Sequence, residues 1–134
     1  MFKKLILTFM MVAGLGVATA NTAIADDHAS TVAAHGTFEG RSDHVTTGGV
    51  SIVKTASGYV AVLESDFSLD GAPDPTLGFG NNGKFDTDTL FTKLESKDGL
   101  QVYAIPANID VSSFSEFYVW CEDFSVPLGV ASLK

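Results

Sequence analysis

The sequence is poor in cysteine, and this shortage excludes several kinds of cofactor. Cys121 is the only cysteine among 134 residues, so an intramolecular disulfide cannot form. Attached c-type haem, iron–sulfur clusters and cysteine-based zinc sites each need more than one thiolate and are not expected. Blue copper is not expected either, because no histidine follows Cys121 and all three methionines lie in the first eleven residues. The cofactor, if there is one, stays unknown.

Basic side chains are also scarce. The chain has 8 Lys and Arg against 16 Asp and Glu, and its net charge is −8. Such an acidic surface repels phosphate backbones and anionic lipid head groups, because binding to either requires clustered Lys and Arg. We therefore expect neither nucleic acid nor an anionic membrane surface as a partner.

Residues 1–25 have the three regions of a secretory signal peptide. Lys3 and Lys4 precede an uninterrupted apolar run, and Ala23-Ile24-Ala25 forms the small-residue cleavage site. The run is ~16 residues long, short of the ~20 that a membrane-spanning helix needs. No cysteine near the cleavage point could carry a lipid. We expect an exported protein without a membrane span after cleavage, either periplasmic in a Gram-negative bacterium or secreted.

Cleavage after Ala25 would create a candidate metal site. The new N-terminus would read Asp26, Asp27, His28. The free amine, the two amides that follow and the His28 imidazole can supply four nitrogens in one plane, the arrangement that Cu(II) and Ni(II) prefer. Two alternatives stay open: cleavage after Ala20 would place the motif inside a longer tail, and the segment could be a leader without a metal.

The rest of the chain has the pattern of a single all-β domain. Residues 26–34 are polar and alanine-rich, so we expect a flexible arm there and a folded domain over 35–134. Short runs rich in β-branched and aromatic residues alternate with turn clusters, and no stretch of twelve residues has a helical period. The sequence predicts a β-sandwich or a closed barrel of about seven to nine short, mostly antiparallel strands.

The expected strands cover residues 36–40, 50–52, 59–63, 76–79, 90–94, 100–105, 117–121 and 125–133. Gly78 and Gly80 should weaken the strand at 76–79. We expect a turn with positive φ at Asn81-Asn82-Gly83 and a helical turn after Asp110, which can cap it. Residues 117–121 are apolar on both faces, so that strand should be central.

Five segments, in order along the chain, resemble the DM-thirteen domain family. They are GTF at 36–38, His44 with GGV at 48–50, DGAPD at 70–74, GLQVY at 99–103, and VWCEDFSV at 119–126 with GVA at 129–131. The family is an extracytoplasmic module proposed to take part in electron transfer, found in animals beside DOMON haem-binding domains. The resemblance implies a β-rich fold, and it places the family's single cysteine, a candidate redox centre, at Cys121.

For Cys121 two interpretations stay open. The thiol could be oxidised to sulfenic acid or form a mixed disulfide with an extracytoplasmic redox or surface protein. Alternatively it is a small buried hydrophobe, because the apolar strand before it and Glu122 and Asp123 after it all disfavour a reactive thiolate. In that case the protein would be a non-catalytic binding, adhesion or structural module with acidic loops.

Acidic residues and histidines offer weaker candidates. Carboxylates around Gly71, Gly80 and Gly83 could form an oxygen-rich calcium site, although they lack the known calcium-loop signature and could simply be solvated. His44 beside Asp43 could be a ligand, a proton carrier or an ordinary turn histidine. Nothing indicates a hydrolytic enzyme, because the sequence has no nucleophile elbow. The calcium candidates are Asp66, Asp70 and Asp74, with Asp86 and Asp88 further along.

Overall fold

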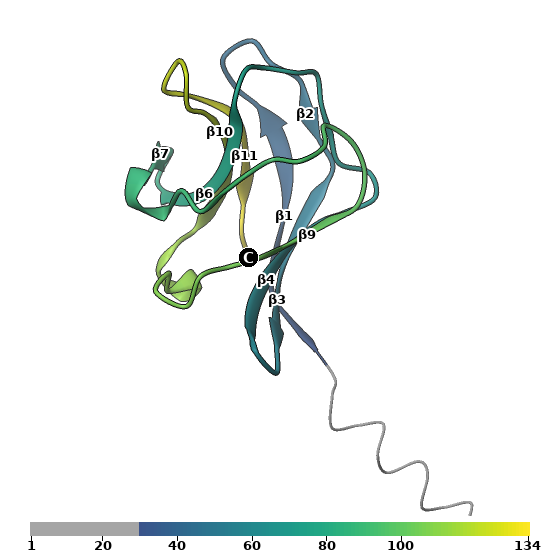
Figure 1. The fold of residues 1–134 in the computed structure, drawn as a ribbon, viewed down its shortest axis with the longest axis vertical. Helices are drawn as coiled ribbons and strands as arrows, with labels where there is room; N and C mark the ends of the chain where they lie inside the picture. Colours follow the sequence, from purple (N-terminus) through teal and green to yellow (C-terminus); the bar gives the residue numbers. More distant parts are fainter. Residues whose placement is uncertain (1–29) are drawn as a thin grey trace, which may run out of the picture.

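A computed structural model describes residues 30–134, and these residues are nearly all in strands and turns (Figure 1). The predicted signal peptide and the motif Asp26, Asp27, His28 lie outside the described residues. The strands are β1 (Thr31–Gly40), β2 (Thr46–Thr47), β3 (Gly49–Thr55), β4 (Gly58–Leu63), β5 (Ser68–Leu69), β6 (Pro75–Asn81), β7 (Lys84–Phe85), β8 (Thr92–Lys93), β9 (Gln101–Ala104), β10 (Glu116–Cys121) and β11 (Val126–Ser132). Two short 3₁₀ turns, η3 (Thr87–Thr89) and η4 (Val111–Ser113), complete the elements.

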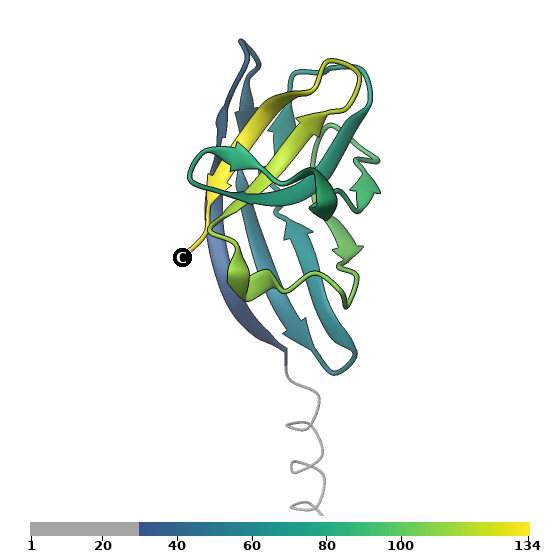
Figure 2. The same cartoon turned by 90° about the vertical axis from the view of Figure 1, so that its left-hand side faces the viewer.

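One curled antiparallel sheet dominates the described part of the chain. Its strand order is β7-β6-β10-β11-β1-β3-β4-β9, β8 pairs with β6 at the side, and β2 pairs with β5 separately. The sheet curls into a half-barrel around the core (Figures 1 and 2). The predicted all-β, antiparallel architecture is confirmed, and the structure shows a half-barrel where the sequence predicts a sandwich or a closed barrel. No helix within residues 30–134 is long and apolar enough to cross a membrane.

Strand β10 is central, as its two apolar faces predict. It lies between β6 and β11. Phe117, Val119 and Cys121 are buried in the core on one face, and Tyr118 is buried on the other. Burial of apolar side chains on both faces is typical of a strand in the middle of a sheet. The position of Cys121 therefore follows from the alternation of this strand.

The glycines of β6 do not interrupt it. β6 runs without a break from Pro75 to Asn81. A Cβ atom at Gly78 would come within 2.7 Å of the Phe85 ring, and one at Gly80 would come equally close to the Tyr118 ring. The glycines therefore make room for aromatic rings on this face. Phe85 uses that room to stack on Trp120, with ring centroids 4.4 Å apart and planes at 14°.

Several expected strand ends differ from the structure, and the start of β1 differs most. β1 begins at Thr31, not at residue 36, so the end of the expected arm pairs with β3. A register shift between Val32 and Ala34 accompanies this pairing, and such an irregularity breaks the alternation that sequence analysis relies on. In the expected strand 90–94 only Thr92–Lys93 pairs, with β6.

The expected turn chemistry is confirmed. Asn82 and Gly83 have φ of 54° and 78°, as a turn between β6 and β7 requires. The Asp110 carboxylate accepts a hydrogen bond from the backbone N–H of Ser112 and so caps η4.

Candidate functional site

Cys121 is the last residue of β10 and lies at the end of the sheet where three connecting loops meet. These loops are residues 41–48, 64–74 and 122–125, and they gather at the top of the molecule in Figures 1 and 2. The residue is only 1% exposed, so the burial expected from the apolar strand is confirmed. Its thiol donates a hydrogen bond to the carbonyl oxygen of Pro73, with Sγ and O 3.2 Å apart.

The segment 70–74, here called the cover loop, holds this carbonyl over the sulfur. Gly71 has φ of 121° and Asp74 has φ of 48°, so the backbone turns sharply near both ends. Ala72 packs against the core, while Pro73 and Asp74 are exposed. A short loop with exposed residues thus lies over the Cys121 thiol.

One end of the cover loop is fixed by His44 and Asp70. Asp70 Oδ1 lies 2.9 Å from His44 Nδ1. Asp70 Oδ2 accepts a hydrogen bond from the backbone N–H of Val45, and the backbone N–H of Asp70 donates one to the Val45 carbonyl. The hydrogen bond from His44, followed by that from Val45, holds the pKa of Asp70 below its ordinary value. His44 therefore pairs with Asp70 in the structure, across the gap between two loops.

The other end of the cover loop is fixed by Asp74. Its carboxylate lies 3.3 Å from the Lys93 ammonium, and its carbonyl accepts a hydrogen bond from the backbone N–H of Glu122. The Asp74–Lys93 pair is exposed, so it contributes only about 0–1 kcal/mol. The cover loop is therefore held by a few local contacts that small changes could release.

The loops around Cys121 form an acidic end of the molecule. Within the described residues, three basic side chains lie there: Arg41 is in one of the loops, Lys93 reaches them from β8, and Lys97 lies beside Gly71 of the cover loop. Charges of one sign gathered at one end produce a field that attracts a partner of opposite charge. The carboxylates of this end belong to Asp43, Glu64, Asp66, Asp70, Asp74, Glu122 and Asp123.

The structure does not bring the calcium candidates together. Asp66 accepts a hydrogen bond from the backbone N–H of Gly49, while Asp70 and Asp74 hold opposite ends of the cover loop. Asp86 caps η3 by accepting from the backbone N–H of Asp88. Within residues 30–134, no three His, Cys, Asp or Glu side chains gather in a way that could hold a metal.

Three aromatic side chains pack together on the face of β10 opposite to Cys121. Phe85 packs between Trp120, at 4.4 Å, and Tyr118, at 5.3 Å between ring centroids. The Tyr118 hydroxyl donates to Glu116, and burial, followed by that hydrogen bond, raises the pKa of the hydroxyl. The alternation of residues 117–121 places Tyr118 and Trp120 on one face, but it does not place Phe85 against them.

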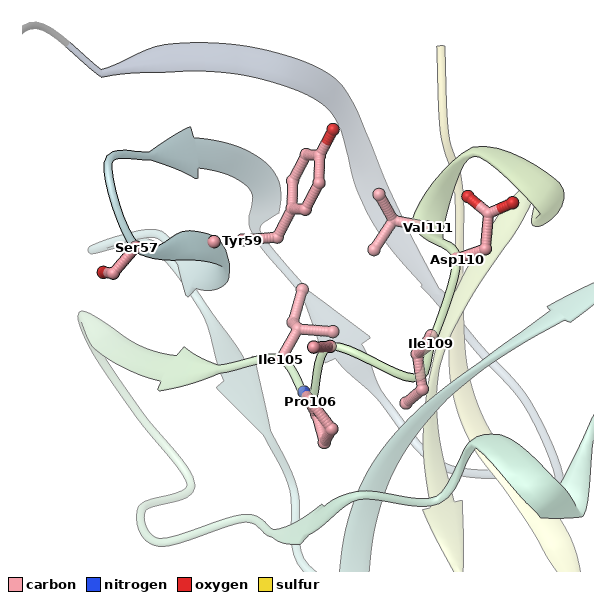
Figure 3. Close-up of a pocket in the computed structure, with 9 residues that line it drawn as sticks. Ser57, Tyr59, Ile105, Pro106, Ile109, Asp110 and Val111 are labelled. Carbon is pink, nitrogen blue, oxygen red and sulfur yellow. The ribbon is translucent and has the colours of Figure 1, made fainter.

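A separate hollow of about 450 Å³ lies at the opposite end of the sheet (Figure 3). Tyr59, Ile105, Pro106, Ile109 and Val111 form its largely apolar walls. Beside the hollow, the Asp110 carboxylate accepts hydrogen bonds from the hydroxyls of Ser112 and Ser113. These hydrogen bonds hold the pKa of Asp110 below its ordinary value. Sequence analysis missed this hollow, because its walls come from two segments that are distant along the chain.

Comparison with known families supports the resemblance seen in the sequence. A family model described as "Electron transfer DM13" matches residues 37–133. The matched range contains Cys121, the cover loop and the strands of the half-barrel from β2 to β11. No curated protein matches the chain, and no solved structure matches it.

Proposed function

Because the chain belongs to the electron transfer DM13 (DM-thirteen) family, we propose that it is an exported electron-transfer-type module with Cys121 as its redox centre. The observation that carries this proposal is the position of the chain's single cysteine. Cys121 falls inside the matched range and at an end of the sheet, where one short loop covers its thiol. A thiol in this position is protected while the loop lies over it and becomes accessible when the loop moves aside.

The redox step we propose uses a peroxide as the oxidant. The Cys121 thiol loses its proton and its sulfur attacks one peroxide oxygen. The O–O bond breaks, the sulfur becomes a sulfenic acid, and the leaving oxygen takes up the proton as part of water. Two electrons thereby pass from the sulfur to the peroxide. A partner thiol then attacks the sulfenic sulfur and releases water, and a second partner thiol restores the Cys121 thiol and leaves a disulfide in the partner.

The cover loop controls this step. Before the sulfur can attack, its hydrogen bond to Pro73 must break and the loop must move aside. The loop is fixed at its two ends by the exposed Asp74–Lys93 pair and by the His44–Asp70 pair. Opening the loop therefore requires the loss of contacts at these ends, while the strands of the sheet stay paired. Loops held in this way belong to the low-stability parts of a fold.

The partner that fits this site carries a basic surface. The acidic end surrounds the cover loop, and complementary charge speeds and orients the encounter of two proteins. A basic face docked on the acidic end would bring an extracytoplasmic redox protein directly over Cys121. Such an encounter should weaken as salt concentration rises.

One specific observation favours a second function: Cys121 is only 1% exposed. In this alternative the thiol serves only to fill the core. The domain would then be a non-catalytic extracytoplasmic binding, adhesion or structural module that uses its acidic loops. Partner binding that survives Cys121→Ala unchanged, without any redox cycling of the wild-type thiol, would favour this alternative.

Export and N-terminal metal binding belong to the same proposal. If cleavage falls after Ala25, N-terminal sequencing of the mature protein begins at Asp26, and the mature chain binds Cu(II) through His28. His28→Ala should then abolish tight Cu(II) binding. A first residue other than Asp26, or unchanged affinity in His28→Ala, would remove the metal motif from the account and leave Cys121 unaffected.

The experiment for the redox function traps the product of peroxide treatment. The purified chain is treated with hydrogen peroxide in the presence of a reagent specific for sulfenic acid and analysed by peptide mass spectrometry. We expect an adduct on the Cys121 peptide in the wild type and none in Cys121→Ala. No adduct in the folded wild type, with an adduct in a chemically unfolded sample, would favour the non-catalytic module.

A further inference from the structure

Strand β9 leaves one edge of the sheet unpaired. β9 ends the strand order and, within the described residues, it pairs with β4 alone among the strands. The backbone N–H of Ile105 donates to the Tyr59 carbonyl on the β4 side. Hydrogen bonding alternates along an antiparallel strand, so the backbone groups of Gln101 and Tyr103 also face β4. The backbone groups of Val102 and Ala104 therefore point to the free edge.

The side chains along this edge are apolar and exposed. Leu100 and Val102 are 65% and 59% exposed, and Ala104 is exposed on the same face of the sheet. Val62 lies opposite Val102, and Val60 opposite Ala104, in the pairing of β4 with β9. Apolar side chains on this face thus continue from β4, where Val60 and Val62 are half-buried, to the exposed edge of the sheet.

This edge lacks the devices that protect sheet edges in other proteins. Natural edge strands carry lysine, proline, a bulge or an inward charge that prevents another strand from adding. Residues 99–105 contain no charged residue and no proline, and the β4–β9 register is regular. At the opposite end of the strand order, β7 has only two residues and one of them is Lys84. β9 is therefore the edge to which a further strand can add.

We propose that two copies of this chain form a dimer by antiparallel pairing of β9 with β9, Val102 lying opposite Val102 of the second copy. In this register Leu100 lies opposite Ala104 on both sides of a two-fold axis. The pattern is therefore self-complementary, and such an isologous contact closes at two copies. The proposal does not depend on the redox role of Cys121.

This orientation lessens the charge repulsion between two copies. The chain has a net charge of −8, so two copies repel one another over most of their surfaces. The seam over residues 99–105 carries no charged side chain. Antiparallel pairing also directs the acidic ends of the two copies away from each other. A short seam buries less area than the ~1,600 Å² of a standard interface, so the dimer should be weak and depend on concentration.

The first test needs no substitution. Sedimentation velocity of the wild-type chain from about 10 micromolar to about 1 millimolar should show a monomer converting to a dimer. Over the same range, amide hydrogen exchange should slow at Val102 and Ala104. Exchange at Gln101 and Tyr103 should change little, because these amides already bond to β4. A monomer at every concentration, or a dimer without slower exchange at Val102, would overturn the proposal.

The second test places charge on the two-fold axis. Val102→Asp and Val102→Lys should each raise the dissociation constant at least tenfold, because like charges then face each other. An equimolar mixture of the two variants should recover dimer, with Asp opposite Lys. Phe124→Asp is the matched control, since Phe124 is 69% exposed and lies in the turn between β10 and β11. A Val102→Asp chain that dimerises like the control, or a mixture that stays monomeric, would contradict this register.

Discussion

The Cys121 thiol donates a hydrogen bond to the carbonyl oxygen of Pro73, 48 residues away in the sequence. This contact ties the end of the central strand to the cover loop. It explains how a cysteine at the margin of the sheet is nonetheless 1% exposed. It also means that motion of the cover loop and chemistry at the sulfur are coupled.

Loosening the cover loop should expose the thiol. Asp74→Asn removes the ion pair with Lys93 but keeps a residue that tolerates positive φ. Because an exposed pair contributes about 0–1 kcal/mol, we expect a thiol reagent to label Cys121 about two- to fivefold faster under native conditions. Asp88→Asn, which changes an exposed carboxylate away from the loop, is the control. Equal labelling rates in the two variants would show that the pair does not hold the loop.

The His44–Asp70 pair predicts a dependence of stability on pH. The pKa of Asp70 is lowered in the folded state, first by the His44 hydrogen bond. The ionised carboxylate therefore stabilises the fold above the ordinary pKa of Asp, and this contribution is lost as pH falls through the lowered value. Asp70→Asn should be less stable than the wild type at pH 6 and should lose less stability on acidification. Urea unfolding at a series of pH values measures both, and parallel stability curves would contradict the assignment.

The stacked rings of Phe85 and Trp120 give a direct optical test of the fold. Trp120 is the single tryptophan of the chain, so the tryptophan emission comes from this ring alone. Phe85→Ala should shift the emission to the red, because water replaces the ring, and should lower the free energy of unfolding by about 1–3 kcal/mol. Phe124→Ala, at a 69% exposed position, should do neither. Unchanged emission in Phe85→Ala would mean that the two rings do not stack in solution.

Much of the local structure follows from the sequence. Alternation along residues 117–121 predicts a central strand that is apolar on both faces, and the turn residues Asn82 and Gly83 predict the reversal between β6 and β7. These features depend on neighbouring residues alone, so the sequence is sufficient for them. The start of β1 was missed because a register shift interrupts its alternation.

Relations across the sheet could not be read from the sequence. The placement of β11 between β10 and β1 depends on the register of the whole sheet. Gly78 and Gly80 suggest a weak strand until the rings of Phe85 and Tyr118 are seen against them. His44 lies beside Asp43 in the chain but bonds to Asp70, 26 residues later. The cover loop above Cys121 arises from these long-range contacts.

The most direct test of the redox role is a complete oxidation and reduction cycle of Cys121 in the folded chain. Hydrogen peroxide is added, then a thiol reductant, and the mass of the Cys121 peptide and the Trp120 emission are followed throughout. We expect Cys121 to gain a single oxygen atom and to lose it again while the emission stays native, and we expect Asp74→Asn to be oxidised faster. If Cys121 stays unmodified in the folded chain under conditions that oxidise the unfolded one, it is not a redox centre.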